Sequence, residues 1–325
     1  MTGNNLQPIA MTLFLTVLVG GCESTKKAEP LTEAKSSAEQ SVRQEHHLLD
    51  EPTSENDQRL RRALAKYPRA DTNRDGVLTL SEIRGHMAKQ REKGRRRGTA
   101  GLAADLRRVF EDRQYVSKDG RRLRYDLMKP KDYDHRRKYP LVLCLHGGGG
   151  STRAARVLAE ATLRAEYPCF VLAPEALVGE TWGKHFPQIM TDVQPLVLEI
   201  IETLKNEFGI DTRRLYITGL SMGGFGTYAF IIRNPGMFAA AVPVCGRGDP
   251  AKAKYIAKIP IWIFHGDKDA LVSVDYSRDM FEALKKAGGN PRYTEYEGLG
   301  HNSWDKAYAT DELWAWLFAQ RKMGK

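Results

Sequence analysis

Short apolar runs alternate with segments of helical periodicity along most of the chain, from about residue 105 to the C-terminus. The runs are rich in Val, Ile, Leu, Phe and Ala, and they occupy residues 141–145, 170–173, 215–218, 240–244 and 261–264. Helical patterns separate them at residues 153–166, 193–208, 224–233 and 276–287. Apolar strands that alternate with helices predict a mostly parallel sheet covered by helices on both faces.

The two ends of this region also have recognisable patterns. Residues 109–116 and 123–128 flank the turn sequence Lys118-Asp119-Gly120 and predict an antiparallel hairpin. Residues 292–297 predict a last strand, and residues 304–320 predict a closing helix. We therefore expect one doubly wound α/β domain over residues 105–325, which is a normal size for a single domain.

A serine lies where one predicted strand turns directly into a helix. The motif there reads Gly219-Leu220-Ser221-Met222-Gly223. A tight turn of this kind presents its serine as a nucleophile, and the flanking residues must be small. A Gly-Ser turn without chemistry is the alternative, but the strand–turn–helix context favours a nucleophile.

A run of glycines follows the predicted strand at residues 141–145, in the sequence His146-Gly147-Gly148-Gly149-Gly150. Glycines allow the backbone N–H groups of Gly147 and Gly148 to approach a substrate oxygen, and the amide of Met222 would be a second donor. These three residues are our candidates for an oxyanion hole. No Lys-Ser or Lys-Thr follows the glycines, which argues against a nucleotide-binding loop.

Candidates for an acid and a base follow the serine in the chain order Ser, Asp, His. The strand predicted at residues 261–264 leads into the sequence His265-Gly266-Asp267-Lys268-Asp269. Asp269 is preferred to Asp267 because it lies further past the strand. We predict that His301 accepts the proton of Ser221 and that Asp269 orients the imidazole. Taken alone, His301 would more often be a surface histidine.

These motifs make the chain from about residue 107 onward resemble the carboxylesterase/phospholipase-like and prolyl-oligopeptidase-like "predicted peptidase" branch of the α/β hydrolases. The matching pieces are His146-Gly147-Gly148-Gly149, the segment from Ile210-Asp211 to Gly226, His265-Gly266-Asp267-Lys268-Asp269 and His301-Asn302-Ser303-Trp304. The resemblance implies an α/β-hydrolase fold and acyl transfer through Ser221, without a cofactor. It also suggests that Trp182 and Trp304 lie near the substrate, with core packing as the alternative.

The same branch resembles feruloyl and acetylxylan esterases, so a small-molecule or polysaccharide ester is the expected substrate. Ester cleavage is favoured over peptide cleavage because the chain has no propeller-sized domain that would gate peptides. Two alternatives remain open. One is a serine peptidase of the same fold, and the other is a calcium-binding envelope protein with an inactive hydrolase domain.

Upstream of this domain, residues 71–82 match the twelve-residue EF-hand loop position by position. The candidate calcium ligands are Asp71, Asn73, Asp75, Val77, Thr79 and Glu82. A polar turn followed by a capping box would explain the Thr and Glu, but not the alternating Asp-x-Asn-x-Asp-Gly. We expect residues 58–90 to form a small helical EF-hand module that binds Ca²⁺ and has no part in the chemistry.

The N-terminal segment has the pattern of an export signal. An apolar run over residues 9–21 ends at Cys22, and Val19-Gly20-Gly21-Cys22 resembles a bacterial lipobox. The run is too short for a membrane-spanning helix, which needs about 20 apolar residues. We expect residues 1–21 to be a signal peptide, Cys22 to be lipidated, and residues 22–57 to form a disordered tether at the bacterial cell envelope, on its periplasmic or surface side. A signal peptide with an incidental cysteine is the alternative.

The net charge of +10 raises the question of a nucleic-acid partner. Residues 89–98 are strongly basic, but no interleaved aromatic residues or nucleic-acid-binding module accompany them. We interpret residues 91–104 as a solvated linker and expect no nucleic-acid partner.

Cysteines are few, and most of them lie in apolar surroundings. Cys144, Cys169 and Cys245 fall within or beside apolar runs, where a thiol behaves as a small hydrophobe. We predict buried structural thiols. A disulfide between Cys144 and Cys169 is the alternative.

Overall fold

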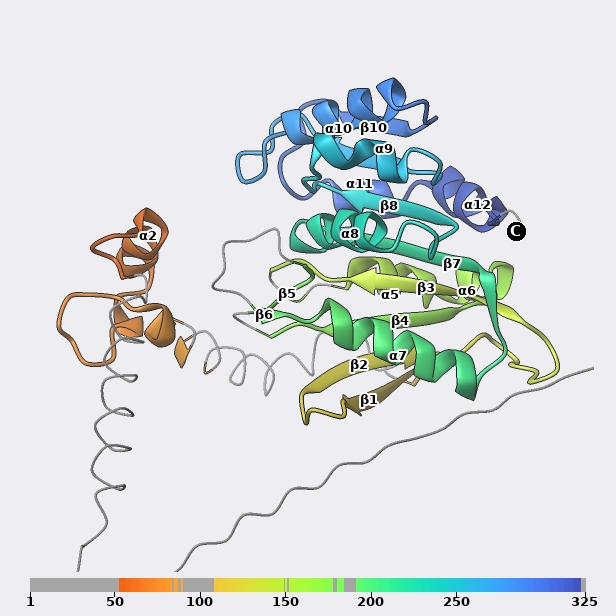
Figure 1. Cartoon of the computed structure of the whole chain (residues 1–325), viewed down its shortest axis with the longest axis horizontal. Helices are drawn as coiled ribbons and strands as arrows, with labels where there is room; N and C mark the ends of the chain where they lie inside the picture. Colours follow the sequence, from red (N-terminus) through yellow and green to blue (C-terminus); the bar gives the residue numbers. More distant parts are fainter. Residues whose placement is uncertain are drawn as a thin grey trace, which may run out of the picture. The chain divides into compact units, whose positions relative to one another are not determined.

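The computed structural model describes residues 53–322, apart from residues 84, 87–88, 90–107, 149, 151, 178–179 and 184–190 (Figure 1). The described residues form a small N-terminal module and a larger α/β domain. Among them, no helix is both long and apolar enough to span a membrane. Cys22, the signal peptide, most of the tether and the basic linker lie outside the described residues, so their predictions stay open.

An eight-stranded sheet forms the centre of the α/β domain, with its strands in the order β1-β2-β4-β3-β7-β8-β9-β10 (Figure 1). Their bounds are β1 (Phe110–Val116), β2 (Arg122–Met128), β3 (Tyr139–Leu145), β4 (Phe170–Glu175), β7 (Ile210–Leu220), β8 (Ala240–Val244), β9 (Trp262–Gly266) and β10 (Arg292–Tyr296). β2 is antiparallel to both β1 and β4, and the remaining neighbours are parallel. Every strand predicted from the apolar runs is present, and the predicted hairpin is β1–β2. A separate pair, β5 (Glu180–Thr181) and β6 (Thr191–Asp192), was not predicted.

Helices cover both faces of the sheet, as the alternating pattern predicts. Alternate residues of β3 belong to two different cores: Leu141 and Leu143 pack on one face, and Val142 packs on the other. The first face is covered by α7 (Gln194–Glu207), α8 (Met222–Arg233), α9 (Ala253–Ile256) and α10 (Asp275–Lys286). The second is covered by α5 (Arg153–Leu158), α6 (Ala161–Glu166), α11 (Trp304–Tyr308) and α12 (Asp311–Ala319).

Two helices that we predicted as continuous are each divided in two. Glu160 has φ −60° and ψ 139°, an extended backbone that separates α5 from α6. Thr310 has φ −77° and ψ 109° and separates α11 from α12, whose first turn carries two acidic residues. An acidic first turn is typical of a helix start, because the N-terminal end of a helix carries a positive partial charge. Apolar periodicity alone does not reveal such breaks.

The small module contains α2 (Gln58–Lys66), the short 3-10 helix η1 (Pro68–Ala70), the loop at residues 71–82 and a further helical stretch at residues 80–83. Within the loop, Asp71 Oδ2 accepts a hydrogen bond from the Gly76 N–H at 2.9 Å. The chain before α2 pairs with the end of this loop: the Ser54 N–H donates to Leu78 O at 2.8 Å, and the Leu78 N–H donates to Ser54 Oγ at 2.9 Å. The loop therefore has a β-bridge partner within its own module.

Candidate active site

Ser221 lies at the junction of β7 and α8, as the motif predicts. Its backbone has φ 53° and ψ −117°, a strained conformation for a residue other than glycine. The Ser221 N–H donates to Val244 O at 2.9 Å, and Ser221 O accepts from the Phe225 N–H at 3.0 Å. The neighbouring strand and the first turn of α8 therefore hold this strained turn in place, which is the geometry of a nucleophile elbow.

The two glycines of the motif are required by close approach of the backbone. A Cβ at Gly219 would lie 2.3 Å from the carbonyl oxygen of Gly223, and a Cβ at Gly223 would lie 2.2 Å from the carbonyl oxygen of Leu145. Both distances are well below van der Waals contact. Any larger residue at these positions would force the elbow open.

Ser221, His301 and Asp269 form one continuous series of hydrogen bonds. Ser221 Oγ donates to His301 Nε2 at 2.9 Å, and His301 Nδ1 donates to Asp269 Oδ2 at 2.7 Å. The Asp269 side chain is fully buried, whereas 18% of the His301 side chain is exposed. Asp267, the alternative acid, instead lies 3.6 Å from Lys268 Nζ. The structure thus brings Asp269 rather than Asp267 to the histidine.

The carboxylate of Asp269 is held by donors at both oxygens. Oδ1 accepts from the Leu271 and Val272 N–H groups, each at 2.9 Å. Burial raises the pKa of Asp269, but the hydrogen bonds from Val272, His301 and Leu271 outweigh it, so this pKa lies below its ordinary value. Asp269 is therefore ionised at neutral pH and can stabilise a positive charge on His301.

His265 also contacts Asp269, and sequence reasoning gave it no role. The Nε2 atom of His265 lies 3.1 Å from Asp269 Oδ2 and 3.0 Å from Val272 O, and donates its hydrogen to them. The Nδ1 atom accepts from Ser277 Oγ at 2.7 Å. Burial lowers the pKa of His265, so the ring is neutral at neutral pH. The sequence signals for this residue are its place at the end of a predicted strand and in the motif His265-Gly266-Asp267-Lys268-Asp269.

The backbone of Gly147 lies beside the serine. A Cβ built on Gly147 would be 3.5 Å from Ser221 Cβ and 3.3 Å from Leu220 O. Met222 is the first residue of α8, where backbone N–H groups have no partner within the helix. Gly148 is exposed, and Gly149 lies outside the described residues. Gly147 and Met222 are thus the better placed of the predicted donors.

The glycine loop is fixed by the buried ring of His146. Its Nδ1–H donates to Gly147 O at 2.7 Å, and its Nε2 accepts from the Ala176 N–H at 2.9 Å. These bonds set the tautomer and tie the loop to the end of β4. His146 therefore acts on the site through the position of Gly147.

Replacing Gly147 with alanine is expected to lower kcat by about 10- to 100-fold, because displaced oxyanion donors cost about this much. The new Cβ would lie 2.6 Å from Leu220 Cδ1 and 3.3 Å from the Leu220 carbonyl oxygen. Gly148→Ala is the matched control, since a Cβ there meets nothing within 4 Å and the backbone N–H is kept. Steady-state kinetics on a short ester checks both variants, and equal effects would contradict the assignment.

For Trp182 the structure shows core packing, the alternative that the sequence left open. Its side chain is fully buried, its Nε1–H donates to His146 O at 3.0 Å, and a Cβ on Gly226 would lie 2.4 Å from Trp182 Cβ. Trp182 supports the glycine loop from within the core. Trp304 is half-buried, and its ring meets that of His301 edge-on at 5.3 Å. Sequence motifs alone do not distinguish these two environments.

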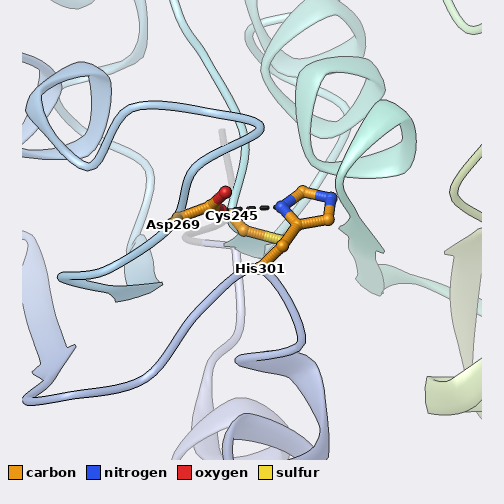
Figure 2. A group of neighbouring side chains, drawn as sticks. All are labelled: Cys245, Asp269 and His301. Carbon is orange, nitrogen blue, oxygen red and sulfur yellow. Dashed lines mark hydrogen bonds and ion pairs between the residues drawn. The ribbon is translucent and has the colours of Figure 1, made fainter.

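Cys245 lies beside the acid and the base, as Figure 2 shows. Its sulfur and the ligand-type atoms of Asp269 and His301 all lie within 4.8 Å of one another. Burial raises the pKa of the Cys245 thiol to about 12, so it is protonated at neutral pH. Cys144 and Cys169 are also free and buried, so the predicted structural thiols are confirmed and the two form no disulfide.

Comparisons with known proteins agree with this fold. Residues 173–312 match the model of the dienelactone hydrolase family. A solved structure of a thermostable esterase is 39% identical, with a TM-score of 0.63, over 66% of this chain and 64% of that chain. The chain has an α/β-hydrolase fold.

Curated proteins similar to this chain include both esterases and a peptidase. The uncharacterized peptidase YuxL of Bacillus subtilis (strain 168) is 26% identical over an alignment of 241 residues that covers 60% of this chain and 36% of YuxL. The bifunctional acetylxylan esterase/xylanase XynS20E of Neocallimastix patriciarum is 29% identical over an alignment of 167 residues that covers 49% of this chain and 24% of XynS20E. The chain thus spans about a third or less of the length of these two proteins.

Proposed function

We propose that this α/β-hydrolase is a serine hydrolase that cleaves carboxylic esters through an acyl-serine intermediate. The observation that carries the proposal is the hydrogen-bonded series from Ser221 Oγ through His301 to the buried Asp269, at 2.9 and 2.7 Å. A serine on a strained elbow, a histidine and an ionised carboxylate in this order make up the machinery of nucleophilic acyl transfer.

The reaction would proceed in two halves. Ser221 Oγ attacks the acyl carbon as its proton moves to His301 Nε2, and the imidazolium then gives that proton to the leaving alkoxide as the C–O bond breaks. A water molecule next attacks the acyl-Ser221 and gives a proton to His301 Nε2. His301 then passes that proton to Ser221 Oγ as the bond between Oγ and the acyl carbon breaks and the acid departs. Asp269 keeps Nδ1 protonated and Nε2 facing the serine throughout.

The backbone N–H groups of Met222 and Gly147 would bind the oxyanion that forms in each half. Fixed donors of this kind are worth about 3 kcal/mol each in a site that excludes water. The elbow places Met222, and the ring of His146 places Gly147 through its 2.7 Å bond to the carbonyl oxygen.

An ester substrate is favoured over a peptide by the relatives. The 39% identical structure is an esterase, and XynS20E carries acetylxylan esterase activity by name. We therefore propose small-molecule esters or acyl esters on polysaccharide as the substrate class. A serine peptidase is the second candidate function, because the relative YuxL is named as a peptidase.

Three substrates test the choice between ester and amide cleavage. The purified protein is given a matched pair, p-nitrophenyl acetate and the p-nitroanilide of the same acid, and also acetylated xylan. Turnover of the esters with little or no anilide cleavage supports the proposal. Faster cleavage of the anilide or of peptides would replace it with the peptidase function.

We further propose that the loop at residues 71–82 binds Ca²⁺. Its candidate ligands are carboxylate, amide, hydroxyl and carbonyl oxygens, the hard donors that Ca²⁺ prefers. The bond between Asp71 Oδ2 and the Gly76 N–H supports this proposal, because it winds the loop around the candidate ligands. EF-hand loops usually occur in pairs, and here the Thr53–Ser54 segment pairs with the loop instead.

Calcium is expected to raise the stability of this module without changing esterase activity. Binding stabilises the folded state by about 2.7 kcal/mol at a calcium concentration of about 100 times Kd. Glu82→Gln removes a charged ligand and should weaken binding about tenfold or more. Isothermal titration calorimetry and thermal melting check both effects, with Glu55→Gln as the control. Equal calcium affinity in the two variants would contradict the site, and loss of ester turnover on chelation would contradict the separate role.

We also propose export and lipid anchoring through Cys22, which would hold the enzyme at the bacterial cell envelope. The lipobox-like ending of the apolar run at residues 9–21 supports this proposal. The mass of the mature N-terminus tests it, since a lipidated Cys22 differs from an unmodified one.

A further inference from the structure

The hydrogen-bonded series of the active site does not stop at Asp269. It continues from Asp269 Oδ2 to His265 Nε2 at 3.1 Å, and from His265 Nδ1 to Ser277 Oγ at 2.7 Å. His265 and Ser277 are both fully buried. They touch neither the solvent nor the space in which an ester would lie, so any effect on the reaction must act through Asp269.

The donors at His265 can be assigned from the partners alone. Its Nε2 faces two acceptors, the carboxylate of Asp269 and the carbonyl oxygen of Val272 at 3.0 Å, so Nε2 carries the hydrogen. Nδ1 is then the acceptor, and the hydroxyl of Ser277 is its donor. Ser277 thus fixes the tautomer of His265, much as Asp269 fixes that of His301.

These bonds tie three separate elements together. His265 lies on β9, Ser277 lies in the first turns of α10, and Asp269 and Val272 belong to the loop between them. That loop faces solvent, for Leu271 is 77% exposed. The buried ring bonds both Asp269 and the Val272 carbonyl oxygen, and so connects the acid-bearing loop to the sheet through side-chain hydrogen bonds. A backbone bond from the Asp269 N–H to Gly266 O at 3.2 Å holds the start of the same loop.

We propose that His265 and Ser277 are a positioning pair that fixes the carboxylate of Asp269 against His301. Without the Nε2–H of His265, Asp269 Oδ2 would keep only its hydrogen bond to His301. Asp269 Oδ1 would still accept from the Leu271 and Val272 N–H groups, and the carboxylate could rotate about that oxygen. A small misplacement of this kind is enough to lower the rate, because the hydrogen bond between Asp269 and His301 must tighten as positive charge develops. This role rests on the proposed serine hydrolase function.

Two variants of His265 distinguish the effect of its hydrogen bond from the effect of the volume of its ring. His265→Phe keeps a ring without donors and is expected to lower kcat on the order of 10²-fold, with KM changed less than about twofold. His265→Gln offers an amide N–H near Nε2 and should recover about tenfold of that loss. Ser277→Ala should lower kcat about three- to tenfold, the size of one neutral hydrogen bond. Tyr308→Phe is its control, since it deletes another buried hydroxyl, bonded to Thr218.

A double-mutant cycle with Asp269→Asn distinguishes positioning from general structural damage. If His265 acts only through Asp269, His265→Phe should cost less than about twofold in the Asp269→Asn background. Each rate is expressed per active serine, counted with a fluorophosphonate probe, so that a smaller folded fraction does not imitate a slower enzyme. The rate at which the probe modifies Ser221 gives the same comparison without an ester. If the wild type is labelled at Ser221 but does not hydrolyse esters, the ester function is refuted. The labelling rates of the variants then still test the positioning pair.

The outcomes are decisive in either direction. A loss confined to kcat, partly recovered by Gln and absent in the Asp269→Asn background, supports the positioning pair. Equal kcat in His265→Phe and the wild type, or additive effects with Asp269→Asn, would overturn it. If His265→Phe does not fold, the comparison of Ser277→Ala with Tyr308→Phe tests the proposal by itself, because each variant removes a single oxygen atom. Equal kcat values for these two variants would also overturn the proposal.

Discussion

Replacing Ser221 with alanine is expected to abolish ester turnover, lowering kcat by about 10⁴- to 10⁶-fold, as removal of a nucleophile does in enzymes of this mechanism. The loss is large because no covalent intermediate can form, while the other residues of the site are unchanged. KM for a short ester should therefore change little. Progress curves at high enzyme concentration, beside the wild type, measure the residual rate.

The control for this change is Ser273→Ala. Ser273 is an exposed serine on the acid-bearing loop, and its hydroxyl donates to Asp275 at 3.1 Å. The kcat of the Ser273→Ala variant should stay within about twofold of the wild-type value, as for an ordinary surface substitution. Residual turnover in Ser221→Ala close to that of the wild type would show that another group is the nucleophile.

Asp269→Asn is expected to lower kcat about 10³- to 10⁴-fold. The amide would no longer stabilise a charged imidazolium, and its NH₂ group would favour the tautomer of His301 that carries the proton on Nε2. That tautomer cannot accept the proton of Ser221. The backbone donors at Leu271 and Val272 would also face a neutral acceptor in place of a carboxylate.

Asp267→Asn is the matched comparison because it makes the same chemical change two residues away. Asp267 faces Lys268 rather than His301, so its replacement should change kcat less than about threefold. Initial rates measured from acid to alkaline pH test both variants. A larger loss in Asp267→Asn than in Asp269→Asn would reverse the assignment of the acid.

The fold was largely predictable from the sequence because its signals are local. A buried parallel strand needs a continuous apolar run, and each run over residues 109–297 became a strand of the sheet. The order Ser221, Asp269, His301 was also predictable, since each residue follows the end of a strand and such ends gather at one edge of a parallel sheet. The breaks after α5 and α11 were missed because they depend on the backbone conformation of Glu160 and Thr310.

The features that escaped prediction depend on contacts between distant segments. The sequence left Trp182 open between substrate contact and core packing, and the residue is packed beneath the glycine loop by α8, which begins 40 residues later in the chain. His265 was passed over because its partners, Asp269, Val272 and Ser277, meet only once the loop has folded back on β9. Burial and hydrogen-bond geometry, rather than residue type, define the roles of these two side chains.

The most direct test of Ser221 as the nucleophile is to label the purified protein with a fluorophosphonate probe and locate the modified residue by peptide mass spectrometry, while ester hydrolysis is followed in the same sample. We expect a single phosphonylated serine at Ser221, loss of turnover in proportion to labelling, and no labelling of Ser221→Ala. A folded protein that hydrolyses esters without reacting at Ser221, or that neither reacts nor hydrolyses them, would contradict this assignment.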